Sequence, residues 1–407
     1  MHSWTNWSGR QTADPALIVA PADRAGFRDA LTEAAARRVP VRAVGASHSH
    51  SRVAAVDGVL VDTDRWQGVI DVRRDDGGAV ATVRSGTRIH ALGPPLHRRG
   101  VALVNQGDID RQSIAGATAT GTHGTGPTLG SLSTSVVGLR VLLADGSEVA
   151  CDPGSEPDLF AVGRQSLGGV GLVTEIDLRV RDRYRLEERQ WTADPEDVVA
   201  DLDRLIAGTR HFEFFWVPDR DRCACKSLAE LPAEPGDESL PADDDPDPDT
   251  DVELVDKRTR RGWSHRIISS IRDDLHTEME YAVPADAGPA CFAELREMVG
   301  SRFSDLFWPI EYRTLAPDDI LIGVSRDRPT VTISVHQDVS IDDRPLFEAS
   351  EEIFRRYDGR PHWGKVHYQT GAELAAIHPG WRHWWELRDR YDPDGRFVTP
   401  DLAALRP

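Results

Sequence analysis

Three segments rich in glycine and other small residues, far apart along the chain, most constrain what it can fold into. They run over residues 44–51, directly after a predicted strand, over 112–126, and over 167–176, where a glycine cluster opens another strand. Small residues let backbone N–H groups turn around an anion, and oriented amides of this kind hold a pyrophosphate. The first segment alone is also typical of an ordinary turn. Three segments at wide spacing indicate a long ligand threaded through one domain.

Short β-branched runs separated by turn residues predict many strands in the first 180 residues. A helix is predicted over 23–38, because alanine and leucine recur at helical spacing and the segment ends before Pro40. The chain lacks the regular alternation of strand and long helix that marks a doubly wound nucleotide fold. We therefore predict an α+β fold. The strands expected in this part lie at residues 40–45, 58–62, 79–83 and 136–146.

The chain has 407 residues, which exceeds the roughly 250–300 at which single cores stop growing, so two domains are expected. We place a ligand-binding domain at 1–182 and a capping domain, with a β-sheet flanked by helices, at 183–359. A C-terminal return at 360–407 completes the first domain and its site. The later elements expected are strands at 278–283, 308–314 and 330–335 and a helical segment at 373–391.

Residues 231–255 are dominated by aspartate, glutamate and proline. Such a segment buries too little apolar surface to offset its ordering entropy, so a mobile acidic loop is predicted. Calcium binding is the alternative for this acid run. It is less favoured because the run lacks a glycine-centred loop that ends in glutamate.

Charge and composition exclude several classes of protein. The chain carries 67 acidic and 48 basic residues, and its net charge of −19 would repel a nucleic acid backbone. No run approaches the roughly 18 apolar residues of a transmembrane helix, and the N-terminus does not resemble a signal peptide, so we expect a cytoplasmic protein without an integral membrane segment. The four cysteines, including Cys223 and Cys225 with one residue between them, are expected to be ordinary thiols, and no metal site is predicted. The sequence leaves the oligomeric state open.

A second group of candidate residues carries charge. Glu311 and Arg313 lie two apart in a predicted strand, so both side chains point to one face and can enter one cavity. Such a pair is also common as a surface ion pair. Only three of the 48 basic residues are lysine, namely Lys226, Lys257 and Lys365. An ammonium can lose its proton when it is desolvated, whereas a guanidinium cannot, so Lys365 is a candidate for proton transfer.

Motifs at both ends of the chain accompany the three small-residue segments. Residues 6–9 read Asn-Trp-Ser-Gly, residues 360–367 read Arg-Pro-His-Trp-Gly-Lys-Val-His, and a tail with Tyr-Asp-Pro-Asp-Gly-Arg-Phe covers 387–397. In this order the motifs resemble the vanillyl-alcohol-oxidase type of flavoproteins, in the branch of alditol oxidases and sugar-1,4-lactone oxidases such as the arabinono-, gulono- and galactonolactone enzymes. The likeness covers both ends and the middle and leaves residues 185–300 weakly covered. It implies that the N-terminal domain binds FAD and that the capping domain binds substrate.

The resemblance implies that His48 is bonded from its ring to the 8α-methyl group of the flavin. The neighbouring His50 is the alternative for the attached residue, and a His48 that only hydrogen-bonds the flavin or the backbone is another. His123 is expected to line the cofactor rather than to act as a base. The residues implied for FAD binding are Ala43, Val44, Gly45, Ala46, Ser47, His48, Ser49, Asp108, Ser113, Gly116, Thr120, Gly121, Thr122, His123 and Val173.

The same resemblance gives roles to the charged residues. Reduced flavin carries negative charge near N1 and the C2 carbonyl, which Arg313 is suited to stabilise. Glu311 is expected to hydrogen-bond substrate hydroxyls, and Lys365 to accept the hydroxyl proton while hydride leaves the same carbon. Ser334 and His336 share a strand face and form a further wall, in the reverse order to the alditol oxidase pattern, which leaves the substrate open. A buried core histidine is the alternative for His336.

The resemblance places Gly107 at the position where dehydrogenases of this family carry an alanine that obstructs oxygen near the flavin. A glycine there favours an oxidase, although glycine also suits any tight turn. The expected reaction oxidises a CH–OH group of a small polyol or aldono-1,4-lactone and passes electrons to dioxygen, which gives hydrogen peroxide. A dehydrogenase that uses a quinone or cytochrome acceptor and a flavin-binding protein without turnover are the alternatives.

Overall fold

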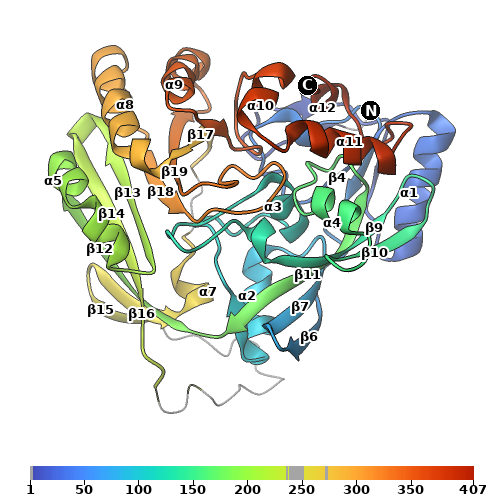
Figure 1. The fold of residues 1–407 in the computed structure, drawn as a ribbon, viewed down its shortest axis with the longest axis horizontal. Coiled ribbons are helices and arrows are strands. Elements are labelled where there is room, and N and C mark those ends of the chain that lie inside the picture. The colour runs from blue at the N-terminus through green and yellow to red at the C-terminus, as the bar shows by residue number, and fades with distance from the viewer. Residues whose placement is uncertain (1–2, 235–236, 238–251, 271–273) are drawn as a thin grey trace.

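In the computed structural model, a six-stranded antiparallel sheet forms the centre of the N-terminal part of the chain, in the order β10-β9-β11-β7-β6, with β8 paired to the end of β11 (Figure 1). Every second residue of β7, β9 and β11 points into a shared apolar core, as the two-residue repeat of a strand requires. The strands are β6 (Val69–Asp75), β7 (Gly78–Arg84), β8 (Val101–Leu103), β9 (Val136–Leu142), β10 (Glu148–Cys151) and β11 (Leu172–Asp182). The structure describes residues 3–234, 237, 252–270 and 274–407.

A three-stranded parallel sheet, in the order β3-β5-β4, carries α1 (Arg24–Arg37) and leads into the first small-residue segment. Asp23 caps the helix by accepting a 2.9 Å hydrogen bond from the Gly26 N–H. The helix packs on the sheet through Phe27, Ala30, Leu31 and Ala34. The helix predicted over 23–38 is thus confirmed. The strands are β3 (Leu17–Val19), β4 (Val41–Val44) and β5 (Val59–Asp62), and β1 (Trp4–Thr5) and β2 (Thr12–Ala13) form a separate pair.

The second half of the chain builds a nine-stranded sheet in the order β15-β16-β12-β14-β13-β18-β19-β17-β20. The strands predicted at 278–283, 308–314 and 330–335 are β17, β18 and β19, although β18 begins two residues later than expected. The strands are β12 (Arg185–Ala193), β13 (His211–Val217), β14 (Arg222–Glu230), β15 (Glu253–Asp256), β16 (Thr259–Trp263), β17 (His276–Pro284), β18 (Ile310–Leu315), β19 (Thr330–Asp338) and β20 (Arg360–Pro361).

The two faces of the nine-stranded sheet differ in chemistry. Helices α8 (Gly288–Arg302) and α9 (Arg344–Arg356) cover one face (Figure 1). Apolar side chains at alternate positions of β17, among them Met279 and Tyr281, pack against these helices. Of the intervening residues, His276, Glu278 and Glu280 are polar and turn to the opposite face. That face looks toward the N-terminal part of the chain and forms one wall of the site described below.

The C-terminal return leaves the nine-stranded sheet at β20 and packs on the N-terminal sheet, where Trp381 and Trp384 join its core. The helical segment expected over 373–391 is two helices. The first helix ends at Ile377, because His378 precedes Pro379 and is extended with φ −105° and ψ 104°. The second begins at Trp381, after Gly380, where a Cβ would lie 2.0 Å from the Leu321 carbonyl oxygen. The remaining helices are α2 (Ile89–Arg98), α3 (Ile114–Thr120), α4 (Pro157–Gly163), α5 (Pro195–Ala200), α6 (Leu202–Ala207), α7 (Ser264–Ile267), α10 (Gly371–Ile377), α11 (Trp381–Tyr391) and α12 (Pro400–Ala403).

The acidic loop expected at 231–255 lies mainly at residues 235–236 and 238–251, outside the described residues. Its last part is not a loop, because residues from Glu253 onward form the edge strand β15 paired with β16. Strand β11 ends on the first sheet at Asp182, and β12 begins on the nine-stranded sheet at Arg185. The domain division at 182 and 359 stays a prediction.

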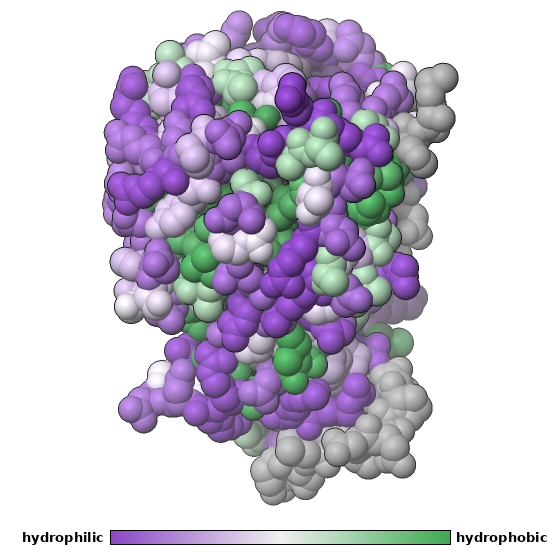
Figure 2. Space-filling view, turned by 90° about the vertical axis from the view of Figure 1, so that its right-hand side faces the viewer, coloured by the Kyte–Doolittle hydropathy of each residue, from purple (hydrophilic) through white to green (hydrophobic). Residues whose placement is uncertain are grey.

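The surface on the α1 side is largely hydrophilic, with hydrophobic side chains in small separate patches (Figure 2). Among the described residues no helix is long and apolar enough to cross a membrane.

Candidate active site

One cavity lies between the N-terminal part of the chain and the polar face of the nine-stranded sheet. Its walls come from the three small-residue segments, from the loop that holds Gly107 and Asp108, from β17, β18 and β19, and from residues 362–365. With one exception, the residues assigned from the sequence to the cofactor and to catalysis all line this cavity. The exception is Gly121, which ends α3 in the left-handed conformation with φ 77°.

The first small-residue segment is held in a tight bend beneath the cavity. Gly45 passes so close to Ser113 that a Cβ would lie 2.1 Å from the serine Oγ. Ser47 adopts a left-handed φ of 54° and is fixed from two sides. Its Oγ accepts a 2.8 Å hydrogen bond from Trp4 Nε1, and its carbonyl accepts one of 2.8 Å from the Trp7 N–H. The shape of this bend therefore depends on Trp4 and Trp7, near the N-terminus.

His48 and His50 lie in different surroundings, which distinguishes the two candidates for the attached residue. The His48 ring lines the cavity and stacks on Trp7, with ring centroids 4.5 Å apart. Burial, together with the nearby Lys365 ammonium, lowers the pKa of His48 to about 4, so its ring is neutral at physiological pH. His50 is 2% exposed and is absent from the cavity wall. Its backbone N–H donates a 2.7 Å hydrogen bond to the Gly364 carbonyl.

Arg42 is a cavity residue that the sequence analysis missed. It is buried, and its Nε donates a 2.7 Å hydrogen bond to the Val53 carbonyl. Its Nη2 is buried without a hydrogen-bond partner among the described residues. A buried guanidinium with a spare donor suits an anionic group. Together with the close-packed glycine bend, it fits the pyrophosphate of a dinucleotide such as FAD.

The charged pair expected on β18 is buried rather than exposed to solvent. Arg313 Nη2 lies 3.2 Å from Glu311 and 2.7 Å from Glu280. Burial disfavours the charged guanidinium, but these two carboxylates outweigh it and raise the pKa of Arg313. The arginine is therefore a fixed cation of the cavity wall, and the surface alternative for this pair is wrong.

Glu280 of β17 joins the two halves of the site. It accepts hydrogen bonds from Arg313 Nη2 at 2.7 Å and from Ser334 Oγ at 2.8 Å. His123 Nε2, from the second small-residue segment, lies 2.6 Å from its other oxygen. Although burial opposes ionisation, His123 and Arg313 hold the pKa of Glu280 well below its usual value. Glu280 is thus an ionised bridge between the predicted catalytic pair and the FAD side of the cavity.

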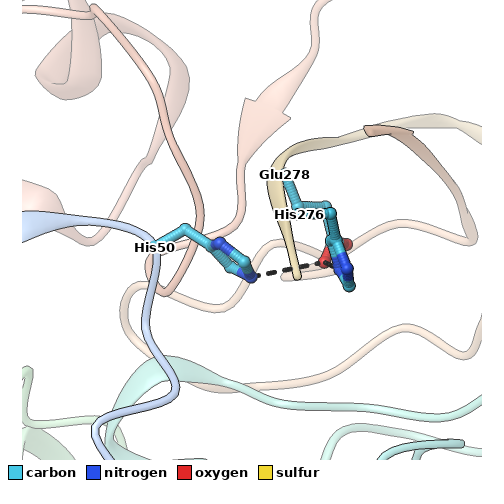
Figure 3. Close-up of side chains that lie close together, drawn as sticks. All are labelled: His50, His276 and Glu278. Atoms are coloured by element: carbon cyan, nitrogen blue, oxygen red, sulfur yellow. Dashed lines mark ion pairs between the residues drawn. The ribbon is translucent and has the colours of Figure 1, made fainter. Parts of the chain in front are cut away.

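Glu278, two residues earlier on the same face, is the centre of a second cluster (Figure 3). Its carboxylate contacts the Lys365 ammonium directly. Nε2 of His50 and Nε2 of His276 each lie 3.8 Å from it, and Nε2 of His336 lies 3.7 Å away. Burial opposes its ionisation, but Lys365 and His336 hold the pKa of Glu278 well below its usual value.

His336 of this cluster presents an acceptor to the cavity. Its Nδ1 lies 2.7 Å from the Pro309 carbonyl, and Nδ1 of His276 lies 3.0 Å from the Asp274 carbonyl. A carbonyl accepts only from an N–H, so Nδ1 carries a proton in both rings, and in the neutral ring of His336 Nε2 keeps its lone pair. Burial lowers the pKa of His336 to about 4, which keeps its ring neutral. His336 is thus both a satisfied buried histidine and part of the cavity wall.

Comparison with known proteins shows the family to which the chain belongs. The chain matches the profile of D-arabinono-1,4-lactone oxidase over residues 176–248 and 247–404, and that of an FAD binding domain over 15–152. The L-gulono-1,4-lactone dehydrogenase of Mycobacterium tuberculosis is 34% identical, with 97% of each chain covered. The chain belongs to the D-arabinono-1,4-lactone oxidase family. It is therefore an FAD-linked oxidoreductase of the lactone and alditol oxidase and dehydrogenase type, and the resemblance seen in the sequence is confirmed.

Other relatives are named after different substrates. A Streptomyces alditol oxidase is 29% identical with 98% of each chain covered, and mouse L-gulonolactone oxidase is 26% identical with 98% of this chain and 97% of its own covered. The crystal structure of Brevibacterium sterolicum cholesterol oxidase superposes with a TM-score of 0.84 at 15% identity, over 100% of this chain and 96% of that one. This similarity confirms the expected two-part fold with an FAD-binding part and a second, sheet-containing part.

Within the fold of this family, the sequence reasoning missed Glu278, Glu280, His276 and Lys226. Lys226 of β14 lies 2.8 Å from Asp108 and 3.0 Å from Glu213, next to the cavity. The sequence could have indicated Lys226, because it is one of only three lysines in the chain. The clusters of histidine and carboxylate also have spacings that suit a metal ion, but at Glu278 the Lys365 ammonium supplies the cation. The absence of a metal stays a prediction.

Proposed function

We propose that this lactone oxidase family member holds FAD through a bond to His48 and oxidises a CH–OH group of a small polyol or aldono-1,4-lactone, with dioxygen as the electron acceptor and hydrogen peroxide as a product. The observation that carries the proposal is the single cavity shared by His48, by Arg313 and Glu311, and by Lys365. FAD, when bound, supplies the acceptor for the two electrons of the carbinol carbon.

The residues that would hold the cofactor are those of the three small-residue segments, with Arg42 toward its pyrophosphate. A bond from the His48 ring to the flavin 8α-methyl needs a ring nitrogen with a free lone pair. The lowered pKa of His48 supplies that state at physiological pH. His50 is the less suitable candidate because it lies behind the cavity wall.

On the substrate side, the chain offers acceptors and one mobile proton. Glu311 accepts hydrogen bonds from substrate hydroxyls, and Nε2 of His336 adds a neutral acceptor. Lys365 and Glu278 act as a pair. Lys365 in its deprotonated form takes up the substrate hydroxyl proton as the carbinol is oxidised, and the ionised Glu278 stabilises the ammonium that forms. Arg313 contributes the fixed positive charge that favours the reduced cofactor. Several acceptors for hydroxyl groups in one cavity suit a polyhydroxylated substrate.

Two observations bear on the electron acceptor. Gly107 lines the cavity without a side chain, which favours access for dioxygen. A dehydrogenase with a different acceptor is the second candidate, and the name of the Mycobacterium tuberculosis relative favours it.

The test combines a spectrum with turnover. The holoenzyme is precipitated with acid, and flavin colour that stays with the pellet and is released in His48→Ala supports the bond to His48. Release of colour from the wild-type protein contradicts it. A panel of polyols and lactones is then mixed anaerobically with the holoenzyme, and bleaching of the flavin followed by peroxide formation on adding oxygen supports the oxidase. Bleaching without peroxide supports the dehydrogenase, and no bleaching with any substrate contradicts the proposed activity.

A further inference from the structure

A buried ion cluster lies directly behind the predicted catalytic pair. Lys226 Nζ, from β14, lies 2.8 Å from Asp108 Oδ1 and 3.0 Å from Glu213 Oε1 of β13. It also approaches the Ile268 carbonyl at 3.4 Å. Glu213 is 3% exposed and Lys226 is 8% exposed, so water does little to screen the charges. One ammonium therefore ties the FAD-side loop of Asp108 to two strands of the other sheet.

The cluster continues into the active site. Carboxylate oxygens of Asp108, Glu213 and Glu311 all lie within 4.8 Å of one another. Asp108 and Glu311 line the main cavity, whereas Glu213 lines only the small cavity behind it. Glu311 in turn lies 3.2 Å from Arg313. A charge on Glu213 thus acts on the Glu311 and Arg313 pair through one layer of side chains.

Three carboxyl groups crowd one buried place, because the oxygens of Asp108, Glu213 and Glu311 lie so close together. Each ionised neighbour disfavours ionisation of the next, and burial adds to that cost. Carboxyl groups at this distance therefore tend to hold a proton.

We propose that Glu213, held in place by Lys226 and Asp108, is a positioning residue that sets the net charge of the Glu311 and Arg313 pair by holding a proton. The inference rests on the proposed role of that pair. With the proton present, Arg313 keeps more of its positive field for the cavity. When the proton leaves, the added negative charge weakens that field and disfavours electron transfer into the cavity.

The groups around Glu213 are consistent with this assignment. Burial and the Asp108 charge raise the pKa of Glu213 to about 7, with Lys226 acting in the opposite direction. The aromatic and aliphatic side chains on the reverse face of β13, such as Phe212 and Phe214, belong to the apolar core. Among the described residues, the ionisable groups that face Glu213 are Asp108 from the FAD-side loop, Lys226 from β14, Glu311 and Arg313 from β18, and His211 from β13 itself.

The first test observes the proton directly. Infrared difference spectra of the holoenzyme between about pH 5.5 and pH 9 are expected to contain the C=O stretch of a protonated carboxyl that disappears with a midpoint near 7. The band should be lost in Glu213→Gln. Glu188→Gln is the matched control, because Glu188 is equally buried on the same sheet and pairs with Arg260 at 2.8 Å, away from the cavity. A band that survives in Glu213→Gln overturns the inference.

The second test changes the positive charge of Lys226. Lys226→Met removes the charge that favours ionised Glu213, so the midpoint of the band should move upward by about one pH unit or more. Lys226→Arg keeps the charge and should move it less, and Lys257→Met, at an exposed position, should leave it unchanged. A midpoint that does not move in Lys226→Met contradicts the proposed arrangement.

The third test links the proton to function. The rate of anaerobic flavin reduction by a substrate should fall as pH rises through about 7, and this fall should be absent in Glu213→Gln, which stays neutral at all pH values. An unchanged fall in Glu213→Gln refutes the effect on the catalytic pair. If no polyol or lactone reduces the flavin, the proposed function fails, while the infrared band still decides the protonation of Glu213.

Discussion

Replacement of Glu280 by glutamine tests the bridge between Arg313 and the FAD side of the cavity. The carboxylate accepts from Arg313 at 2.7 Å, from Ser334 at 2.8 Å and faces His123 at 2.6 Å. Both ring nitrogens of His123 face oxygen, since Nδ1 lies 2.8 Å from the Gly124 carbonyl. A glutamine keeps one oxygen for Arg313 and turns its NH₂ group toward His123, so one charge-assisted hydrogen bond is lost.

The magnitude follows from that single bond. A hydrogen bond to a charged group contributes about 1.5–3 kcal/mol. Because the glutamine no longer ties His123 to the Arg313 side of the cavity by this bond, we expect kcat/KM for flavin reduction to fall by about 10- to 150-fold. Glu280→Ala removes all three contacts and leaves Arg313 with one fewer partner. It should therefore cost about 3–5 kcal/mol of stability as well.

The assay is stopped-flow flavin reduction with flavin content measured on the same sample, and Glu188→Gln serves as the control for a buried glutamate outside the site. The pH dependence of stability gives a second readout. Because the pKa of Glu280 is lowered in the folded protein, its stabilisation is complete above the ordinary glutamate pKa of about 4.3 and is lost as pH falls below that value. This part of the acid sensitivity should be absent in Glu280→Gln. A fully flavinylated Glu280→Gln enzyme with kcat/KM within twofold of wild type refutes the reasoning.

Three further substitutions have expected outcomes. Gly45→Ala forces a methyl group against Ser113 and should cost about 1–3 kcal/mol of holoenzyme stability and lower the FAD content, and full FAD content at unchanged stability would contradict the tight bend. Gly107→Ala, whose Cβ would lie 2.9 Å from the His123 carbonyl, should slow reoxidation by dioxygen more than reduction by substrate, and equal slowing of both steps would count against a role in oxygen access. Lys365→Met should lower kcat/KM by at least about 100-fold with flavin retained, and a smaller loss would remove the lysine from proton transfer.

Much of the fold could be predicted from local patterns. The helix at α1 and the strands that became β4, β5, β7, β17 and β19 follow from β-branched runs and turn residues. Element ends were less accurate, because they depend on contacts far away in sequence. Strand β18 is an example, since it begins at Ile310, where its pairing with β13 and β19 begins, and not at 308. The break between α10 and α11 has a local cause, because His378 precedes Pro379 and is extended.

The catalytic side of the site was only half visible in the sequence. A strand pattern tells which residues share a face, and so it brought Glu311 and Arg313 together. It does not tell which strands are neighbours. In the sheet, Ser334 of β19 lies opposite Glu311 on one side and Glu280 on the other, and this pairing alone brings Glu280 to Arg313. The polar residues 276, 278 and 280 also alternate in the sequence, but the sequence does not show which strands lie beside them.

Lysine usage carries information that local pattern does not. Lys226 lies in a buried ion pair beside the cavity and Lys365 in a partly buried ion pair of its wall, whereas Lys257 is exposed. A tetrahedral ammonium directs three donors out of one plane, so Lys226 can reach two carboxylates and the Ile268 carbonyl at once, which the planar fork of an arginine does not match. In a chain that otherwise uses arginine for positive charge, such a site therefore retains lysine. Rarity of a residue type, read together with burial, thus locates a charged group whose geometry matters.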